Sequence, residues 1–250
     1  MFPLMHVKAV VDIHGTIDDN LILGSLLPDV LRLTGCGWSR SHSAAHFIKN
    51  TLGKCHGITI GAMLHGEYPP GVDFYSDVGF KNIPWGWAFY TAWKYTTKHL
   101  YYPLPKGLVP WVFHNMVEAS VDIYLHEQWD KSLIAHVKDV YSWNVKWDVV
   151  EKMIIESGLN LARNLKDAYV DYLTLSLGKY HDRRCFVRSL YEIARRKFYR
   201  HGIVMNLPID LFEEVWYAIY KDREFLYEQY VSVAYDGLKR TYKEWCSGEI

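Results

Sequence analysis

Hydrophobic residues in the C-terminal half of the chain recur every three or four positions, which is the spacing of one face of an α-helix. One such series runs from Val149 to Leu165, a second begins at Leu190 and includes Phe198, and a third follows Pro208. Apolar and polar residues nowhere alternate strictly over six positions between turn signals. The pattern therefore predicts an all-α fold.

Glycine and proline divide the chain into two regions. They are frequent between Gly53 and Pro110, which predicts short helices and loops there. Beyond Val112 only Pro208 interrupts the helical pattern. The glycines expected to end helices in this region are Gly158, Gly178, Gly202, Gly237 and Gly248. No repeat and no clear linker divides the sequence, so we expect one helical domain over residues 1–250.

Composition and charge narrow the functional classes. The 28 Lys and Arg residues balance 28 Asp and Glu residues, so no global charge favours DNA, RNA or an acidic membrane. No apolar stretch approaches the roughly 18 residues that span a bilayer, and the first residues lack a secretory signal pattern. The four cysteines show no C-x-x-C spacing and are expected to be reduced thiols. These features predict a soluble, cytoplasmic protein without a transmembrane segment, and they leave its oligomeric state open.

The sharpest chemical signal lies in the segment 113–126. On a helix, His114, Glu118 and Asp122 would lie one turn apart along one face. An imidazole and a carboxylate at this spacing can bind one metal ion, and their mix of nitrogen and oxygen suits Zn, Mn or Fe. The alternative is a solvated stripe of charges on an amphipathic helix.

Two further segments place polar residues within apolar surroundings. Asp29 follows Pro28 at the end of an apolar helical run, where it is either a site residue or a cap for the next helix. His65 closes another apolar segment and is followed by Asp73 and Asp77. A lone histidine there is usually a hydrogen-bonded core residue, but the two aspartates favour a site.

Three more histidines are candidates. His14 lies near the N-terminus in the sequence Asp-Ile-His. His42 and His46 are four residues apart, and the sequence does not decide which of them faces the other candidates.

In their order along the chain, these segments resemble the zinc-dependent phospholipase C and single-strand nuclease superfamily, an all-helical group of metal-dependent phosphoesterases. The segments that carry the resemblance are Gly24-Ser-Leu-Leu-Pro-Asp29, Gly61-Ala-Met-Leu-His65 and His114-Asn-Met-Val-Glu118. The chain is more loosely similar to acyl-carrier-protein phosphodiesterases. The resemblance covers residues 10–126 and implies a phospholipase C/nuclease-like domain. Its metal-site half would span about 10–130, with a C-terminal helical extension at about 145–247.

The resemblance also implies two or more divalent metal ions, with zinc expected and manganese or iron as alternatives. The ligands that it implies, together with Asp122 from the helical spacing, are His14, Asp29, His65, His114 and Glu118, with Asp73 and one of His42 or His46. Asp29 and Glu118 would bridge metal ions, and an unligated Asp73 or Asp77 would act as general base. The substrate would be a small-molecule or lipid phosphoester. The aromatic loop 83–90 would form an apolar wall for it, unless its rings merely pack.

Two non-catalytic interpretations compete with the enzyme. Basic residues interleaved with aromatic ones dominate the segment 183–200, and such a helix can bind nucleic acid or a nucleotide. A solvated face paired with acidic neighbours is the commoner outcome, so the nucleic-acid signal is not strong. The other alternative is a helical scaffold that retains the histidines without activity. The dipeptide His181-Asp182 lacks the further elements of helical HD-type phosphohydrolases, and we attribute it to chance.

Overall fold

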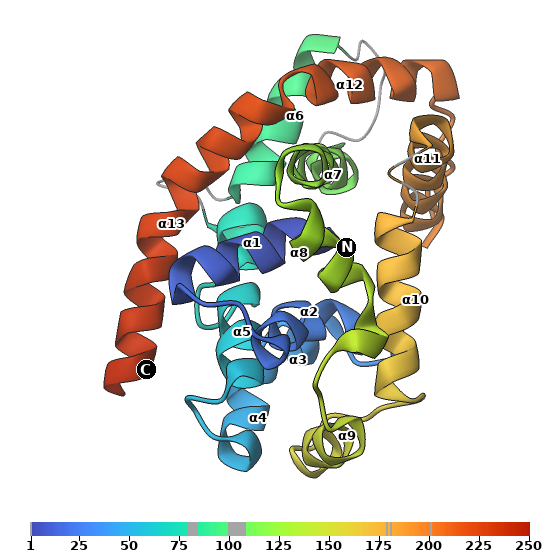
Figure 1. Cartoon of the computed structure of the whole chain (residues 1–250). Helices are drawn as coiled ribbons and strands as arrows, with labels where there is room; N and C mark the ends of the chain where they lie inside the picture. Colours follow the sequence, from blue (N-terminus) through green and yellow to red (C-terminus); the bar gives the residue numbers. More distant parts are fainter. Residues whose placement is uncertain (1, 80–84, 100–108, 179, 181, 201) are drawn as a thin grey trace.

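The computed structural model describes residues 2–79, 85–99, 109–178, 180, 182–200 and 202–250. Over these ranges the chain is helical and contains no strand, which confirms the predicted all-α fold (Figure 1). The helices, with the π-helical turn η1 and the 3-10 turn η2, are α1 (Pro3–His14), α2 (Asp19–Leu33), α3 (Trp38–Ser41), α4 (Ala44–Leu52), α5 (Gly57–His65), η1 (Phe74–Val78), α6 (Trp87–His99), α7 (Val109–Gln128), α8 (Lys131–Lys138), η2 (Val140–Ser142), α9 (Trp147–Glu156), α10 (Leu165–Leu177), α11 (Arg183–Arg200), α12 (Ile209–Lys221) and α13 (Arg223–Ser247).

The N-terminal helix α1 lies between two parts of the molecule. On one side it contacts α2 and α5, and on the other it contacts α7 (Figure 1). α7 is in turn surrounded by α6, α12 and α13, and α13 runs along one side of the molecule to the C-terminus. The interior between α1, α2, α5 and α7 is therefore where residues far apart in sequence meet.

Two glycines allow α2 and α5 to cross closely. A Cβ atom at Gly24 would lie 2.7 Å from the Ile58 Cα, and one at Gly61 would lie 2.5 Å from the Ser25 nitrogen. Both distances are shorter than the roughly 3.5 Å at which carbon and neighbouring heavy atoms pack. The absence of side chains at these two positions thus sets the helix separation. Asp29 and His65 lie about one turn beyond the crossing on the two helices.

The helix α2 continues further than the sequence suggested. Its N-terminus is capped by Asp18, whose carboxylate accepts a hydrogen bond from the Leu21 N–H at 2.9 Å. The expectation that Asp29 ends the helical run after Pro28, and the alternative that it caps the next helix, are both wrong, because α2 runs on to Leu33. A proline removes only one helical hydrogen bond, and apolar neighbours buried on several sides hold this helix together past the gap.

Glycines end the later helices where the sequence predicts, with one exception. The glycines that lie within two residues of a helix end are Gly158, Gly178, Gly202 and Gly248. Gly158 also divides the apolar series that begins at Val149 into α9 and α10. The predicted stop at Gly237 is wrong, because this residue lies inside α13. A Cβ there would overlap the hydroxyl of Tyr75, so the glycine permits η1 to approach α13.

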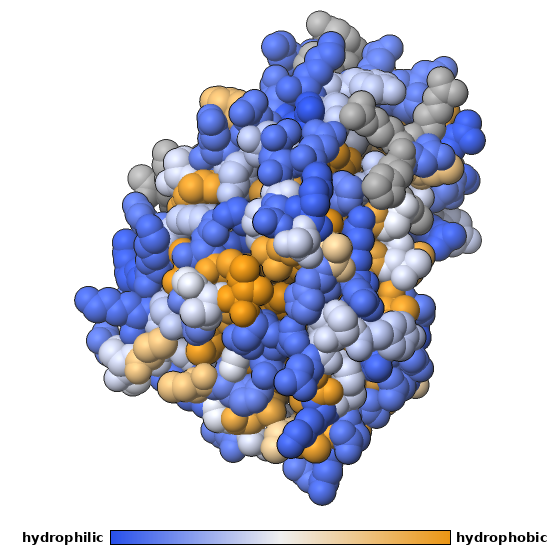
Figure 2. Space-filling model, viewed as in Figure 1, coloured by the Kyte–Doolittle hydropathy of each residue, from blue (hydrophilic) through white to orange (hydrophobic). Residues whose placement is uncertain are grey.

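The surface is mixed in polarity. Hydrophilic side chains cover most of the face shown in Figure 2, and a hydrophobic patch lies near its middle, around α1. Among the described residues, no helix combines the length and the apolar character that crossing a bilayer requires.

Candidate metal centre

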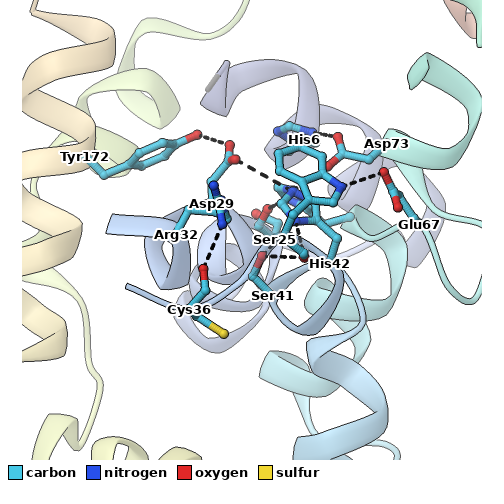
Figure 3. A network of polar contacts seen from close by, with 12 residues as sticks. His6, Ser25, Asp29, Arg32, Cys36, Ser41, His42, Glu67, Asp73 and Tyr172 are labelled. Atoms are coloured by element: carbon cyan, nitrogen blue, oxygen red, sulfur yellow. Dashed lines mark hydrogen bonds and ion pairs between the residues drawn. The ribbon is translucent and has the colours of Figure 1, made fainter. Parts of the chain in front are cut away.

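Histidine and carboxylate side chains meet in the interior of the molecule. Figure 3 shows part of this cluster, with His6, His42, Asp29 and Asp73 pointing toward one another. The side chains of the cluster form sets of three in which the potential ligand atoms lie within 4.8 Å of one another. Two of these sets share His65, and together they make up the first donor group, which consists of His6, Asp29, His42, His65 and Asp73. The remaining set is the second donor group, which consists of Asp77, His114 and Glu118. All eight residues are buried except Asp77, which is partly buried.

Asp73 is the centre of the first donor group. Its Oδ1 lies 2.8 Å from Nε2 of His6, and its Oδ2 lies 2.9 Å from Nε2 of His42 and 3.2 Å from Nε2 of His65. Asp29 approaches from the other side, with its Oδ1 3.9 Å from Nε2 of His42. Three imidazoles and two carboxylates from different elements thus point toward one another.

The backbone fixes the orientation of two of these imidazoles. Nδ1 of His65 donates a hydrogen bond to the Ser25 carbonyl at 2.5 Å. Nδ1 of His42 donates to the Trp38 carbonyl at 3.2 Å and lies 2.8 Å from the Ser41 hydroxyl, which itself donates to the Trp38 carbonyl. Because a carbonyl only accepts, the proton of each neutral ring lies on Nδ1. Nε2 of each ring is left facing the carboxylates without a hydrogen bond. Metal-binding histidines usually have this arrangement, in which one nitrogen is held by the protein and the other is free for the ion.

A closed loop returns the chain from His65 to Asp73. The Glu67 N–H donates to the His42 carbonyl at 3.0 Å, and the Gly71 N–H donates to the Gly66 carbonyl at 2.9 Å. Side chains at Gly66 or Gly71 would overlap backbone atoms of this loop, because both positions are packed against carbonyl groups. The glycines that interrupt the helix after His65 are therefore the residues that bring Asp73 back to it.

The second donor group is held by α6, α7 and η1. The ring of Phe89 stacks on His114 with centroids 4.2 Å apart, and the Ser76 hydroxyl donates a hydrogen bond to Oε1 of Glu118. The Gly86 N–H donates to the Asp77 carbonyl at 3.0 Å and joins the start of α6 to η1. Aromatic packing and short polar contacts thus position this group as they do the first.

Burial and mutual charge shift the pKa values of the donors in both directions. Burial and the charge of His65 lower the pKa of His6 to about 4. Burial opposes ionisation of Asp73, yet the charges of His65 and His6 hold its pKa well below its ordinary value. Burial acts against protonation of His65, but the charge of Asp73 raises the pKa of that ring. Burial, together with the negative charge of Asp73, raises the pKa of Glu118 to about 7. The carboxylates thus repel one another, and a cation among them would relieve that repulsion.

Seven of the residues predicted from the sequence belong to the two donor groups. These are Asp29, His42, His65, Asp73, Asp77, His114 and Glu118. Of the two histidines that the sequence left undecided, His42 is the one in the first group. The alternative of a solvated stripe on α7 is wrong, because His114, Glu118 and Asp122 are all buried.

Three predicted ligands lie outside the donor groups. His14, at the end of α1, contacts the Thr16 hydroxyl at 2.6 Å. The ring of His46 lies against Tyr68 and Trp245. Asp122 shares the buried face of α7, but it accepts hydrogen bonds from the Met5 N–H at 2.6 Å and from the Tyr180 hydroxyl. Its carboxylate therefore links α7 to α1 and to the turn that follows α10.

The sequence reasoning missed His6. It lies eight residues before His14 on α1, which corresponds to about 12 Å along a helix. The available signal was its position among the apolar residues of the segment 4–10, in which only His6 and Lys8 are polar, because a histidine buried there requires a polar partner. Asp73 supplies that partner from 67 residues away.

The predicted aromatic wall is only partly described. Ile83 and Pro84 lie outside the described residues. Trp87 is buried and Phe89 packs on His114, while Trp85 has 38% of its surface exposed. A second exposed ring, that of Trp38, stacks on His42 with centroids 3.7 Å apart.

Comparison with known proteins adds no assignment. No family model matches the chain, and neither a curated protein nor a solved structure matches it.

Proposed function

We propose that the two donor groups bind two or more divalent metal ions, with zinc as the expected ion and manganese or iron as alternatives. We further propose that the chain is a metal-dependent hydrolase of phosphoesters with a phospholipase C/nuclease-like arrangement of helices. The observation that carries the proposal is the pair of buried Nε2 atoms of His42 and His65. They face carboxylates without hydrogen bonds while the backbone holds the opposite nitrogens.

The donor chemistry suits these ions. Imidazole nitrogens and carboxylate oxygens together are typical of catalytic zinc, manganese and iron sites. Four histidines and four carboxylates exceed the ligands that one tetrahedral ion needs, which favours more than one ion. His65 belongs to two of the donor sets, so it lies between the positions that two neighbouring ions would occupy.

Hydrolysis is the reaction that such a centre supports best. When bound, divalent ions make hydroxide available near neutral pH and offset the charge on a phosphoryl oxygen. In this chain, Tyr172 donates a hydrogen bond to Oδ2 of Asp29 at 2.6 Å and thereby orients that carboxylate. Ser76 orients Glu118 in the same way. Because Asp73 and Asp77 both belong to donor groups, we assign them to ligation first, and their role as general base stays a prediction.

The exposed rings beside the donors suit an organic substituent on the phosphoester. Trp38 covers His42, and its indole N–H donates to Oε1 of Glu67 at 2.9 Å, which fixes the ring. With 42% of its surface exposed, Trp38 combines contact with the buried donors and access to solvent. Trp85 immediately precedes Gly86, whose N–H donates a hydrogen bond to the Asp77 carbonyl. A lipid or nucleoside phosphoester fits this combination of polar interior and aromatic margin.

Metal analysis tests the proposal directly. The protein is stripped with a chelator, dialysed against zinc and analysed for metal per chain, and hydrolysis of bis(p-nitrophenyl) phosphate is then measured. We expect at least two zinc ions and metal-dependent hydrolysis. His65→Ala should lose zinc and activity, because this imidazole belongs to two donor sets.

His14→Ala is the matched control. It removes a histidine from the same N-terminal half, but one that contacts Thr16 and Tyr242 and no donor. We expect it to keep the zinc content and activity of the wild type. The same loading is repeated with manganese and with iron. Less than one ion of each of the three metals per wild-type chain would refute the metal centre. Zinc retained by His65→Ala would refute the ligand assignment.

Binding of nucleic acid by α11 stays an alternative. Arg188, Arg195 and Arg196 line adjoining hollows on this helix, but Arg195 already pairs with Glu192 at 3.0 Å. The side chains of residues 183, 184, 197 and 200 lie outside the described part. Retention of single-stranded DNA that falls with added salt would favour this function, and no retention at low salt would end it.

A further inference from the structure

Two buried polar groups near the donor groups lack hydrogen-bond partners among the described residues. Tyr230 of α13 has no exposed surface, and its hydroxyl makes no hydrogen bond. The indole Nε1 of Trp87, at the start of α6, is likewise buried and without a partner. The two rings are in contact, with centroids 5.4 Å apart. Because the large majority of buried polar groups are hydrogen-bonded, two adjacent exceptions point to an acceptor that binds there.

The surroundings of Tyr230 connect it to both donor groups. Its helix α13 contacts α5, η1 and α7, which carry His65, Asp77 and Glu118. Burial, followed by the negative charges of Asp73 and Glu118, raises the pKa of Tyr230 well above its ordinary value. These carboxylates belong to different donor groups, and neither accepts a hydrogen bond from Tyr230. The charges of both carboxylates thus act on the hydroxyl, although neither carboxylate accepts its hydrogen bond.

Resting on the proposed metal centre, we infer that the Tyr230 hydroxyl donates a hydrogen bond to a phosphate-class oxyanion held by the two donor groups, with the Trp87 indole N–H as a second donor. The metal ions would supply the positive charge for this anion, and the two neutral donors would fix its orientation. A donor that is already in place before the ligand arrives needs no rearrangement, which is the property that makes fixed donors effective in active sites. Tyr230 is then a residue that contacts substrate, in addition to the metal ligands.

A neutral, protonated hydroxyl suits this role. Its raised pKa keeps Tyr230 protonated throughout the neutral pH range, so that it can donate to an anion. Phenylalanine would keep the ring and its contact with Trp87 while removing only the donor. The substitution Tyr230→Phe therefore separates the hydrogen bond from the packing.

The test uses zinc and inorganic phosphate as probes. We expect Tyr230→Phe to bind the same amount of zinc as the wild type, while calorimetric titration shows at least about tenfold weaker phosphate binding to the zinc-loaded protein. In the metal-free protein, we expect an unchanged or higher melting temperature, because the variant removes a buried hydroxyl that has no partner.

Tyr169→Phe is the matched control. The Tyr169 hydroxyl is also buried, but it donates to the Leu23 carbonyl at 2.6 Å. Its removal should lower the melting temperature of the metal-free protein and leave phosphate affinity unchanged. The two variants should thus have opposite profiles.

Four results would overturn the inference. The first three are wild-type zinc protein that does not bind phosphate, equal phosphate affinity in Tyr230→Phe, and loss of zinc from Tyr230→Phe, which would assign the hydroxyl to the metals. A lower melting temperature of metal-free Tyr230→Phe, matching that of Tyr169→Phe, would also overturn it by indicating a structural role. Failure of the wild-type protein to bind zinc would instead refute the proposed metal centre.

Discussion

Replacing Gly61 by alanine should force α2 and α5 apart and weaken metal binding at the proposed centre beside their crossing. A Cβ at this position would lie 2.5 Å from the Ser25 nitrogen and 2.7 Å from the Gly24 carbonyl carbon. These are backbone atoms, so no side-chain rotation relieves the overlap. The helices must separate by about 1 Å to restore ordinary van der Waals contact.

Both stability and metal affinity should fall. Overpacking costs about 1–3 kcal/mol, and the higher helix propensity of alanine offsets up to about 1 kcal/mol of it. The net loss therefore lies between about 0 and 3 kcal/mol. A loss near the middle of this range, about 1–2 kcal/mol, lowers the melting temperature of a protein of this size by roughly 2–8 °C. The same displacement would break the bond from His65 Nδ1 to the Ser25 carbonyl, now 2.5 Å long. Loss of such a supporting partner typically weakens metal binding about 10–100-fold.

Thermal unfolding of the metal-free protein and competition with a zinc-chelating dye measure the two effects. Gly37→Ala is the control, because a Cβ there would meet no atom within 4 Å and the backbone φ is −65°. We expect the control to keep both properties. A lower melting temperature with unchanged zinc affinity would show that the crossing supports the fold but does not position the site. No change in either property would refute the close contact itself.

Two further substitutions test other contacts. Tyr172→Phe removes the hydrogen bond to Asp29 and should reduce zinc affinity about tenfold or more. The control Tyr191→Phe loses a hydrogen bond to the Leu207 carbonyl and should reduce only stability. Equal zinc affinities for the two variants would contradict the orienting role of Tyr172. Burial raises the pKa of Asp122 from its ordinary 3.8 to about 6, so its contribution to the free energy of unfolding is present at low pH and is lost as the pH rises through 6. The side chain in Asp122→Asn stays neutral at every pH. Between pH 4 and pH 8, denaturant unfolding should therefore show the free energy of unfolding of this variant rising by up to about 3 kcal/mol relative to that of the wild type. Parallel pH profiles of the two unfolding free energies would contradict this.

Local geometry made part of the site predictable from the sequence. His114 and Glu118 are four residues apart, and a helix necessarily places such residues on one face. The sequence also marked Asp29 and His65 as polar residues within apolar runs. In each case the helix that carries the residue can be predicted from the spacing of the apolar residues around it in the sequence.

The remaining donors depend on contacts between distant segments. His14 and His6 lie on the same helix, but only the position of α7, η1 and α5 around α1 determines which of them meets Asp73. Asp73 itself returns to His65 because the loop after Gly66 closes on the His42 carbonyl. A one-dimensional pattern contains neither of these facts, because each depends on how complete helices pack.

The cost of the donor groups argues against a scaffold without a ligand. Replacing buried ionic groups with apolar side chains of similar size is often neutral or stabilising. Here four carboxylates and four imidazoles gather in or beside a core whose other members are mainly apolar. Burial together with the charge of Asp73 raises the pKa of Glu118 to about 7, which shows that the interior does not fully compensate that carboxylate. Packing alone gives no reason to keep this arrangement. A bound cation would offset the free-energy cost of burying the carboxylates, so we favour the metal-binding interpretation.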